Sequence, residues 1–240
     1  MIKFFRSLRQ DTISKNKFTK YFLYAIGEIV LVVIGILIAL QINNWNQSIK
    51  KQQTLKNILN TVSYDLITDT TVTSRFIKIE EEMIKHSSRI INKEINITNY
   101  KECPYCPSIA TTYRPFNINL KGYDQLRSLI EDNTSQKDSL LTDIVQFYTI
   151  HIGLIEQSND MLKNTVFKNV EDFQKYDWFV DWTQGHPNPD MIAYFASGEE
   201  YRKKVAAYSI LASKNHLLYL KSFNRNAIYI LDKLDKRNKN

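Results

Sequence analysis

Glycine and proline are scarce in this chain, with six and five residues among 240. Both residues mark turns, so their scarcity disfavours a fold of many short strands joined by tight turns. It favours long helices instead. Residues 46–92 contain neither residue. The sequence therefore predicts an all-α protein.

Catalytic and metal-binding patterns are also missing. There is no GxSxG, HExxH, P-loop or dinucleotide fingerprint. Asp177 and Asp181 flank Trp178, as paired carboxylates do in sugar-active sites, but solvated positions on a helix face explain them more simply. No two of the histidines stand three or four residues apart; they are His86, His151, His186 and His216. We therefore expect no enzyme activity, no cofactor and no metal site.

One long apolar run is present, at Phe22–Ile42. As a helix it would reach roughly 30 Å, the thickness of a bilayer's hydrocarbon core. Trp45 follows it, where an indole prefers the headgroup layer, and serves as an interfacial anchor. A cleaved signal peptide is disfavoured because no A-x-A pattern ends the run, and a lipoprotein signal would need a cysteine. A buried core helix remains an alternative, but the sequence favours an uncleaved transmembrane helix.

The charge distribution predicts how the span is oriented. The chain carries a formal net charge of +7. Six cations crowd the first twenty residues against Asp11 alone; they are Lys3, Arg6, Arg9, Lys15, Lys17 and Lys20. Next to an apolar span such a cluster indicates attraction to anionic lipids rather than to nucleic acid. The positive-inside rule then places residues 1–21 in the cytoplasm and residues from about 46 onward across the membrane.

The anchor carries a resemblance. Tyr24–Asn46 reads YAIGEIVLVVIGILIALQINNWN, and a weaker similarity covers Phe116–Tyr148, where Leu129 stands in place of an expected Gly. The block resembles an uncharacterised family of single-pass membrane proteins from Bacteroidota, a domain of unknown function. That resemblance implies the inner membrane of a Gram-negative bacterium and a periplasmic C-terminal domain. It implies no activity.

Beyond the span, apolar residues recur in steps of three and four, which is typical of amphipathic helices. We predict a helical stalk over 43–94, a loop over 95–121 that contains Pro104, Pro107 and Pro115, and an antiparallel helical bundle completed by 122–240. Asp69–Thr73 suggests a kink or a break in one helix, and Gln157–Asp160 suggests a break in another. The aromatic residues between Phe173 and Trp182 are expected to close the core, or else to form an interface or substrate platform.

Cys103 and Cys106 form a CPYC motif like the dithiol of glutaredoxins. Pro107 prevents a helix from starting at the second cysteine, so the strand–helix setting of those enzymes is missing. A structural disulfide in an oxidising compartment is the favoured interpretation. Thiol–disulfide exchange is the alternative, and zinc binding would need a second pair of ligands.

Glu28 is the one charged residue inside the span. Either its side chain reaches back toward Lys20 and the headgroups, or it faces another membrane helix. Gly35 and Ala39 lie on the same helix face and would permit close helix approach. The second interpretation predicts a homo-oligomer or a complex with another membrane protein. We thus expect a membrane-anchored scaffold or accessory subunit, with a ligand sensor acting through a partner as the alternative.

Overall fold

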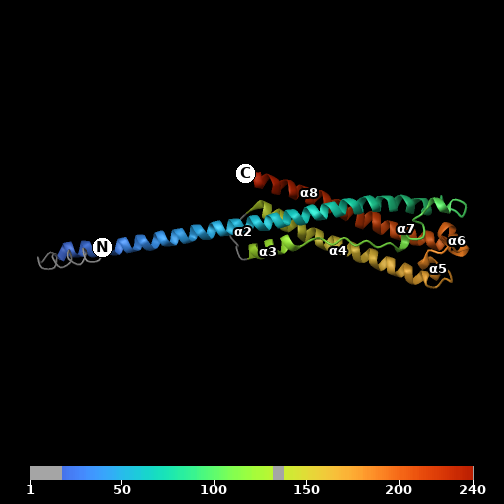
Figure 1. The fold of residues 1–240 in the computed structure, drawn as a ribbon, viewed down its shortest axis with the longest axis horizontal. Coiled ribbons are helices and arrows are strands. Elements are labelled where there is room, and N and C mark those ends of the chain that lie inside the picture. Colours follow the sequence, from blue (N-terminus) through green and yellow to red (C-terminus); the bar gives the residue numbers. More distant parts are fainter. Residues whose placement is uncertain (1–17, 132–137, 240) are drawn as a thin grey trace. The chain divides into compact units, whose positions relative to one another are not determined.

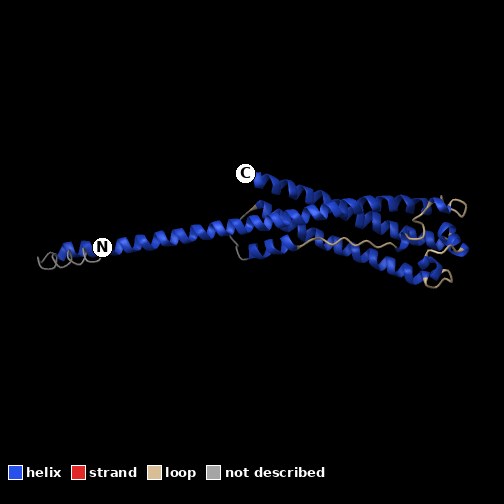
Figure 2. Ribbon diagram, in the orientation of Figure 1, coloured by secondary structure: helices blue, strands red, loops and turns tan. Residues whose placement is uncertain are grey.

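A computed structural model describes residues 18–131 and 138–239 of the chain. The described residues contain helices and no β-strand (Figures 1 and 2), so the all-α prediction is confirmed for them. The elements in chain order are α2 (Phe18–Ile91), η1 (Tyr100–Glu102), η2 (Ile109–Thr111), α3 (Lys121–Glu131), α4 (Ser139–Phe173), α5 (Phe179–Gln184), α6 (Pro189–Ser197), α7 (Glu199–Leu211), η3 (Ala212–His216) and α8 (Leu217–Lys239). The chain divides into two compact units, Met1–Lys56 and Asn57–Asn240.

The described part of the first unit belongs to α2 and contains the apolar run. Among the described residues, α2 is the one helix long and apolar enough to cross a membrane. None of its most apolar stretch is buried. Apolar surface of this extent is unfavourable in water and favourable in hydrocarbon. The chain is therefore a candidate single-pass membrane protein.

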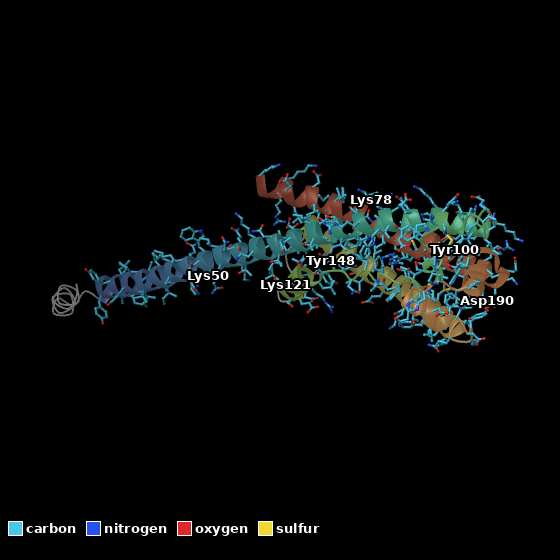
Figure 3. All side chains as sticks on the ribbon, turned by 45° about the vertical axis from the view of Figure 1, so that its right-hand side comes forward. Lys50, Lys78, Tyr100, Lys121, Tyr148 and Asp190 are labelled. Carbon is cyan, nitrogen blue, oxygen red and sulfur yellow. A yellow bond between two sulfur atoms is a disulfide. The ribbon has the colours of Figure 1, made fainter. Side chains whose placement is uncertain are left out.

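The second unit is built around α4, against which α3, α7, η3 and α8 all pack. The last part of α2 is tied to α8 by Asn224, whose Nδ2 donates to the Thr70 carbonyl at 3.0 Å and to Thr73 Oγ1 at 2.8 Å. Side chains fill the space between these helices (Figure 3). Fully buried members of this core are Leu66, Leu126, Ile144, Tyr148, Ile155, Leu220 and Phe223.

The helix break predicted at Asp69–Thr73 is wrong. α2 passes through this segment without interruption. The hydroxyls of Thr70, Thr71 and Thr73 each donate to the carbonyl four residues earlier, at 2.8 Å, so the helix satisfies them internally. The break predicted at Gln157–Asp160 is also absent, because α4 is continuous from Ser139 to Phe173.

The apolar spacing over Glu199–Asp235 predicts one long helix, but the structure divides this segment into α7, η3 and α8. α7 and α8 are joined by Ala212–His216, which forms a π-helical turn. Such turns are often found where a helix is adjusted around a functional or buried polar group. Here the turn contains His216, which is completely buried.

Between α2 and α3 the chain forms no α-helix. Residues 92–108 make turns and the short η1 segment, η2 follows, and residues 112–120 run extended to the start of α3 (Figure 2). No hydrogen bond between main-chain groups is formed by residues 113–119 within the described structure. Their polar main-chain groups therefore depend on side chains or solvent.

Candidate functional site

The CPYC motif lies in the turn region and forms a disulfide between Cys103 and Cys106. Both residues are buried, with exposed fractions of 1% and 0%. Tyr201 donates its hydroxyl to the Cys106 carbonyl, and the Trp182 Nε1–H donates to the Pro107 carbonyl at 3.0 Å. Thiol–disulfide exchange requires an attacking thiolate to reach a sulfur atom. The burial of both cysteines opposes that attack and favours a structural role.

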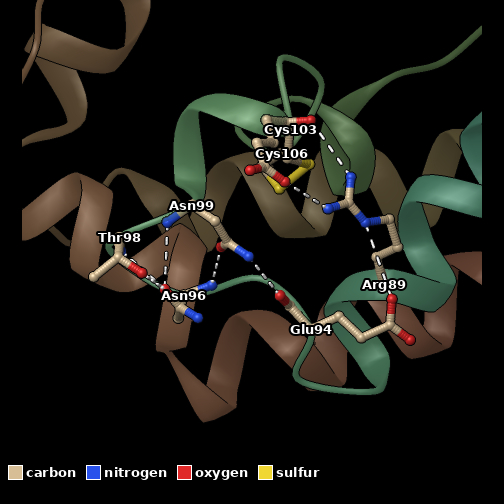
Figure 4. A network of polar contacts seen from close by, with 8 residues as sticks. Arg89, Glu94, Asn96, Thr98, Asn99, Cys103 and Cys106 are labelled. Carbon is tan, nitrogen blue, oxygen red and sulfur yellow. Dashed lines mark hydrogen bonds and ion pairs between the residues drawn. A yellow bond between two sulfur atoms is a disulfide. The ribbon is translucent and has the colours of Figure 1, made fainter.

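Polar contacts fasten the same region to the end of α2 (Figure 4). Arg89 donates to the Glu102 carbonyl at 3.4 Å and forms an ion pair with the Glu102 carboxylate at 3.3 Å. Asn99 Nδ2 donates to the Glu94 carbonyl at 2.8 Å, and Asn99 Oδ1 accepts the Asn96 amide at 2.8 Å. These contacts hold the turn beside the disulfide in one conformation.

The aromatic residues after α4 belong to the core. Phe173 is fully buried and packs edge-on against Trp178 and Phe195, with ring centroids 5.6 and 5.5 Å apart. Trp178 is also buried and stacks on Tyr176 at 4.9 Å. These contacts favour the core-closing interpretation over a substrate platform.

Side chains from four helices form hydrogen bonds with the main chain between Cys106 and Gly122. Asn169 Nδ2 donates to the Ala110 carbonyl at 2.7 Å. Asn159 Nδ2 donates to the Phe116 carbonyl at 2.7 Å, and its Oδ1 accepts the Phe116 amide at 3.3 Å. Tyr201 and Trp182 likewise donate to the main-chain carbonyls of Cys106 and Pro107. The segment is therefore held by hydrogen bonds to its main chain.

Two buried aspartates complete this arrangement from α2. Asp69 accepts the Asn119 amide at 3.0 Å and the Asn119 side-chain amide at 2.6 Å. Asp65, one turn earlier, accepts the Gly122 amide at 2.7 Å. Burial raises the pKa of Asp69 to about 6, and the charge of Asp65 adds to that rise. With a pKa of about 6, the Asp69 carboxyl can be either protonated or ionised near neutral pH.

A Ser–His contact lies inside the core. His216 Nδ1 is 3.1 Å from Ser158 Oγ, which itself donates to the Ile155 carbonyl at 2.9 Å. With the single hydroxyl hydrogen of Ser158 directed at the Ile155 carbonyl, Nδ1 is the donor in this contact. That polarity is opposite to the one in which a histidine accepts a proton from a nucleophilic serine. Burial lowers the pKa of His216 to about 4, which keeps the ring neutral.

Glu80 of α2, Arg114 of the extended segment and Tyr208 of α7 influence one another electrostatically. Glu80 is buried, and burial raises its pKa while the Arg114 guanidinium opposes that rise. Glu80 Oε2 and Arg114 Nη1 are both buried without a hydrogen-bond partner in the described structure. The pKa of nearby Tyr208 is raised by burial and then by the Glu80 charge.

The other residues singled out from the sequence are not gathered into one site. His186 and Asp177 are exposed, and Asp181 accepts the Asn188 side-chain amide at 2.7 Å. His151 is buried, and its Nε2 lies 3.1 Å from Asn226 Nδ2. Among the described residues, no three His, Cys, Asp or Glu residues are grouped as a metal would require.

In the apolar part of α2, Glu28, Gly35 and Ala39 have exposed positions, as does Trp45. A Cβ atom added at Gly35 would meet nothing within 4 Å. Gly35 follows Glu28 by seven positions and Ala39 follows Gly35 by four, so the three share a helix face. That helix face is exposed.

The polar core residues were the ones that sequence analysis missed. Asp65 and Asp69 are four residues apart inside an apolar stripe that contains Val62 and Leu66. That spacing places them on the buried face, which is the signal that could have identified them. Asn159 and Asn169 gave no comparable signal, because their partners are 43 and 59 residues away.

Comparison with known proteins gives one match. Residues 28–113 match the profile of a Family of unknown function (DUF6090). The matched range begins inside the apolar run, covers the rest of α2 and ends at Tyr113 in the extended segment, so Phe116–Tyr148 lies outside it. Searches of curated proteins and of solved structures give no match. The match supports a domain of unknown function and no specific activity.

Proposed function

We propose that the protein is a single-pass inner-membrane protein of a Gram-negative member of the Bacteroidota, which acts through protein–protein contacts. The span is Phe22–Ile42, with Trp45 at its outer interface. Residues 1–21 are cytoplasmic, and residues from about 46 form a periplasmic antiparallel helical bundle with a Cys/Pro loop. Its role is that of a scaffold or accessory subunit rather than an enzyme.

The observation that carries this proposal is the division of the chain into two chemically different parts. Residues 1–56 hold nine Lys and Arg residues against Asp11 and Glu28, whereas residues 57–240 hold 23 basic and 23 acidic residues. The whole net charge of +7 therefore belongs to the part that contains the exposed apolar run. A basic segment beside an apolar helix favours a cytoplasmic N-terminus, and an electrically balanced domain is compatible with export.

The described polar residues of the second unit support a binding role over a catalytic one. Asn159, Asn169, Asp65 and Asp69 are used to hold the main chain of this protein. In the contact between Ser158 and His216 the histidine donates to the serine, which is not the arrangement of a nucleophilic serine and its base. A face of the span that carries Glu28, Gly35 and Ala39 offers the surface for association with a second copy or another membrane protein.

Fusions at Asn240 test the topology. An alkaline phosphatase fused there should be active, and a fluorescent protein that matures only in the cytoplasm should be dark. A matched pair of fusions after Lys20, in front of the span, should give the opposite result. A fluorescent fusion at Asn240 would overturn the proposed orientation.

Purification from native membranes in a gentle detergent tests the role. The proposal expects a stoichiometric protein partner or a second copy to remain bound to the tagged full-length chain. A monomer that carries a metabolite and no protein would overturn it in favour of a ligand sensor.

A further inference from the structure

The start of α3 lies unusually close to α2. A Cβ atom built at Gly122 would stand 2.5 Å from the Val62 amide nitrogen and 2.7 Å from its Cα. Glycine is therefore required for this approach, which brings the Gly122 amide within 2.7 Å of Asp65 Oδ2. Anionic side chains favour the amino end of a helix, so Asp65 suits that position electrostatically.

The adjacent turn of α2 holds the chain just before α3. Asp69 binds both the main-chain and the side-chain amide of Asn119. Asp65 and Asp69 thus fasten the end of the extended segment and the beginning of α3 to one helix face. The exposed fractions of these residues are 5% and 1%, so their mutual repulsion is weakly screened by water.

The groups around the two carboxylates do not neutralise them. α3 contributes Tyr123, whose ring stacks on Tyr148 of α4 at 4.7 Å. Tyr148 is completely buried, and its hydroxyl has no hydrogen-bond partner in the described structure. Its pKa is raised by burial and then by the charges of Asp65 and Asp69.

The remaining elements supply neutral groups. His151, one turn further along α4, has its pKa lowered by burial and contacts Asn226 of α8. Asn224 of α8 donates to Thr70 and Thr73 on the next turn of α2. Burial raises the pKa of Asp69, the two hydrogen bonds from Asn119 lower it, and the charge of Asp65 raises it further.

We propose that Asp65 and Asp69 form a proton-binding site that latches α3 and residues 116–122 onto α2, and that uptake of one proton tightens the latch. The proton is taken from solvent and is held on the Asp69 carboxyl. Protonation weakens one of the two hydrogen bonds that Asp69 accepts from Asn119. It also removes a buried charge and its repulsion with Asp65, and burial is the larger effect on the Asp69 pKa.

The direction of the effect follows from proton linkage. Asp69 has an ordinary pKa of 3.8 in the released state and a pKa of about 6 in the latched state. The latched state therefore binds more protons between these values, and the latch weakens as pH rises through 6. Between pH 7.5 and pH 5, the equilibrium constant for latching should increase about tenfold.

Hydrogen exchange of the full-length protein in detergent tests this. Exchange of the amides of α3, corrected for the intrinsic effect of pH, should be about tenfold more protected at pH 5 than at pH 7.5. Asp69→Asn, which has no titrating group, should abolish this difference. Asp65→Asn should move the transition to lower pH because it removes the adjacent charge.

Asp172→Asn provides the control. Asp172 binds Lys175 and Lys204, away from α3, so the variant should retain the wild-type pH profile of α3. A wild-type profile that is flat or reversed, or a full response in Asp69→Asn, would overturn the proposal. If Asp69→Asn does not fold, an unchanged transition in Asp65→Asn would overturn it equally.

Discussion

Asn159 of α4 pairs with both main-chain polar groups of Phe116, donating to its carbonyl at 2.7 Å and accepting from its amide at 3.3 Å. One side chain thereby replaces the partners that a β-strand neighbour would provide. Because Phe116 is buried, neither group has ready access to water. The pair fixes the middle of the extended segment on α4.

Asn159→Ala should lower the free energy of unfolding by about 2–4 kcal/mol, because it leaves two buried main-chain groups unpaired. Urea unfolding of the full-length protein, followed by circular dichroism, measures the change. Asn164→Ala on the exposed side of the same helix is the matched control and should stay within about 0.5 kcal/mol of wild type. Equal stability of the two variants would contradict the inferred role of Asn159.

Gly122→Ala should be destabilising by about 1–3 kcal/mol, since its Cβ would meet the Val62 main chain at 2.5 Å and one helix must shift. Gly153→Ala is the opposite case. Gly153 lies inside α4 with nothing within 4 Å of the added atom, so alanine should stabilise the helix by about 0.5–1 kcal/mol. Thermal unfolding of the two variants should shift in opposite directions; shifts of the same sign would show that α3 does not approach α2 this closely.

The sequence predicted the helical class, the apolar run and the buried stripe of α2, because these depend on composition and on periodicity along one element. It failed at Asp69–Thr73 and at Gln157–Asp160, where polar residues were interpreted as helix breaks. In the structure Asp69 and Asn159 have partners in the extended segment, and those partners stabilise polar residues within a continuous helix. Such contacts join residues 43 and 50 positions apart, which a local pattern does not reveal.

The π-helical turn illustrates the same limit. Residues 199–235 show the apolar spacing of one helix, and nothing in that pattern marks Ala212–His216. His216 is buried against Ser158 of another helix, and this contact depends on packing rather than on the local sequence. The sequence likewise named the two cysteines without indicating that Tyr201 and Trp182 donate to the main chain at Cys106 and Pro107.

His216 should make the whole fold less stable in acid. Its pKa is about 4 in the fold against 6.5 in its ordinary state, so the unfolded chain binds more protons between these values. The stability that its neutral form contributes is present above pH 6.5 and is lost as pH falls toward 4. Between pH 7.5 and pH 5 this residue should account for a loss of about 2 kcal/mol.

His216→Asn keeps a side-chain amide to donate to Ser158 and removes the titration. Urea unfolding at the two pH values should show a smaller acid-induced loss in this variant than in wild type, by that amount. Identical losses in the two proteins would show that His216 is not buried neutral. This global effect has the opposite sign to the local tightening of α3, so the two can be separated.

The disulfide should contribute modestly to stability. Cys106 follows Cys103 by three positions, so the disulfide closes a very short loop. A fifteen-residue loop is expected to add about 3 kcal/mol to the free energy of unfolding, and this one should add less. Replacing both by Ala should leave a folded protein with a slightly lower melting temperature and an intact cellular phenotype. Loss of the phenotype in a variant with normal helicity would favour the thiol-exchange alternative instead.

Glu28, Gly35 and Ala39 should together form an association face of the membrane helix. A carboxylate at this depth in hydrocarbon is costly unless it is protonated, reaches the headgroups or finds a partner, whereas Gly35 and Ala39 allow a second helix to approach. Glu28→Ala and Gly35→Leu should each reduce crosslinking or co-purification in native membranes while leaving membrane insertion intact. Leu37→Ala, on the opposite side of the helix, is the control and should assemble like wild type. If Glu28→Ala and Gly35→Leu also assemble like wild type, Glu28 reaches the headgroups on its own, and the partner surface must lie in the helical domain.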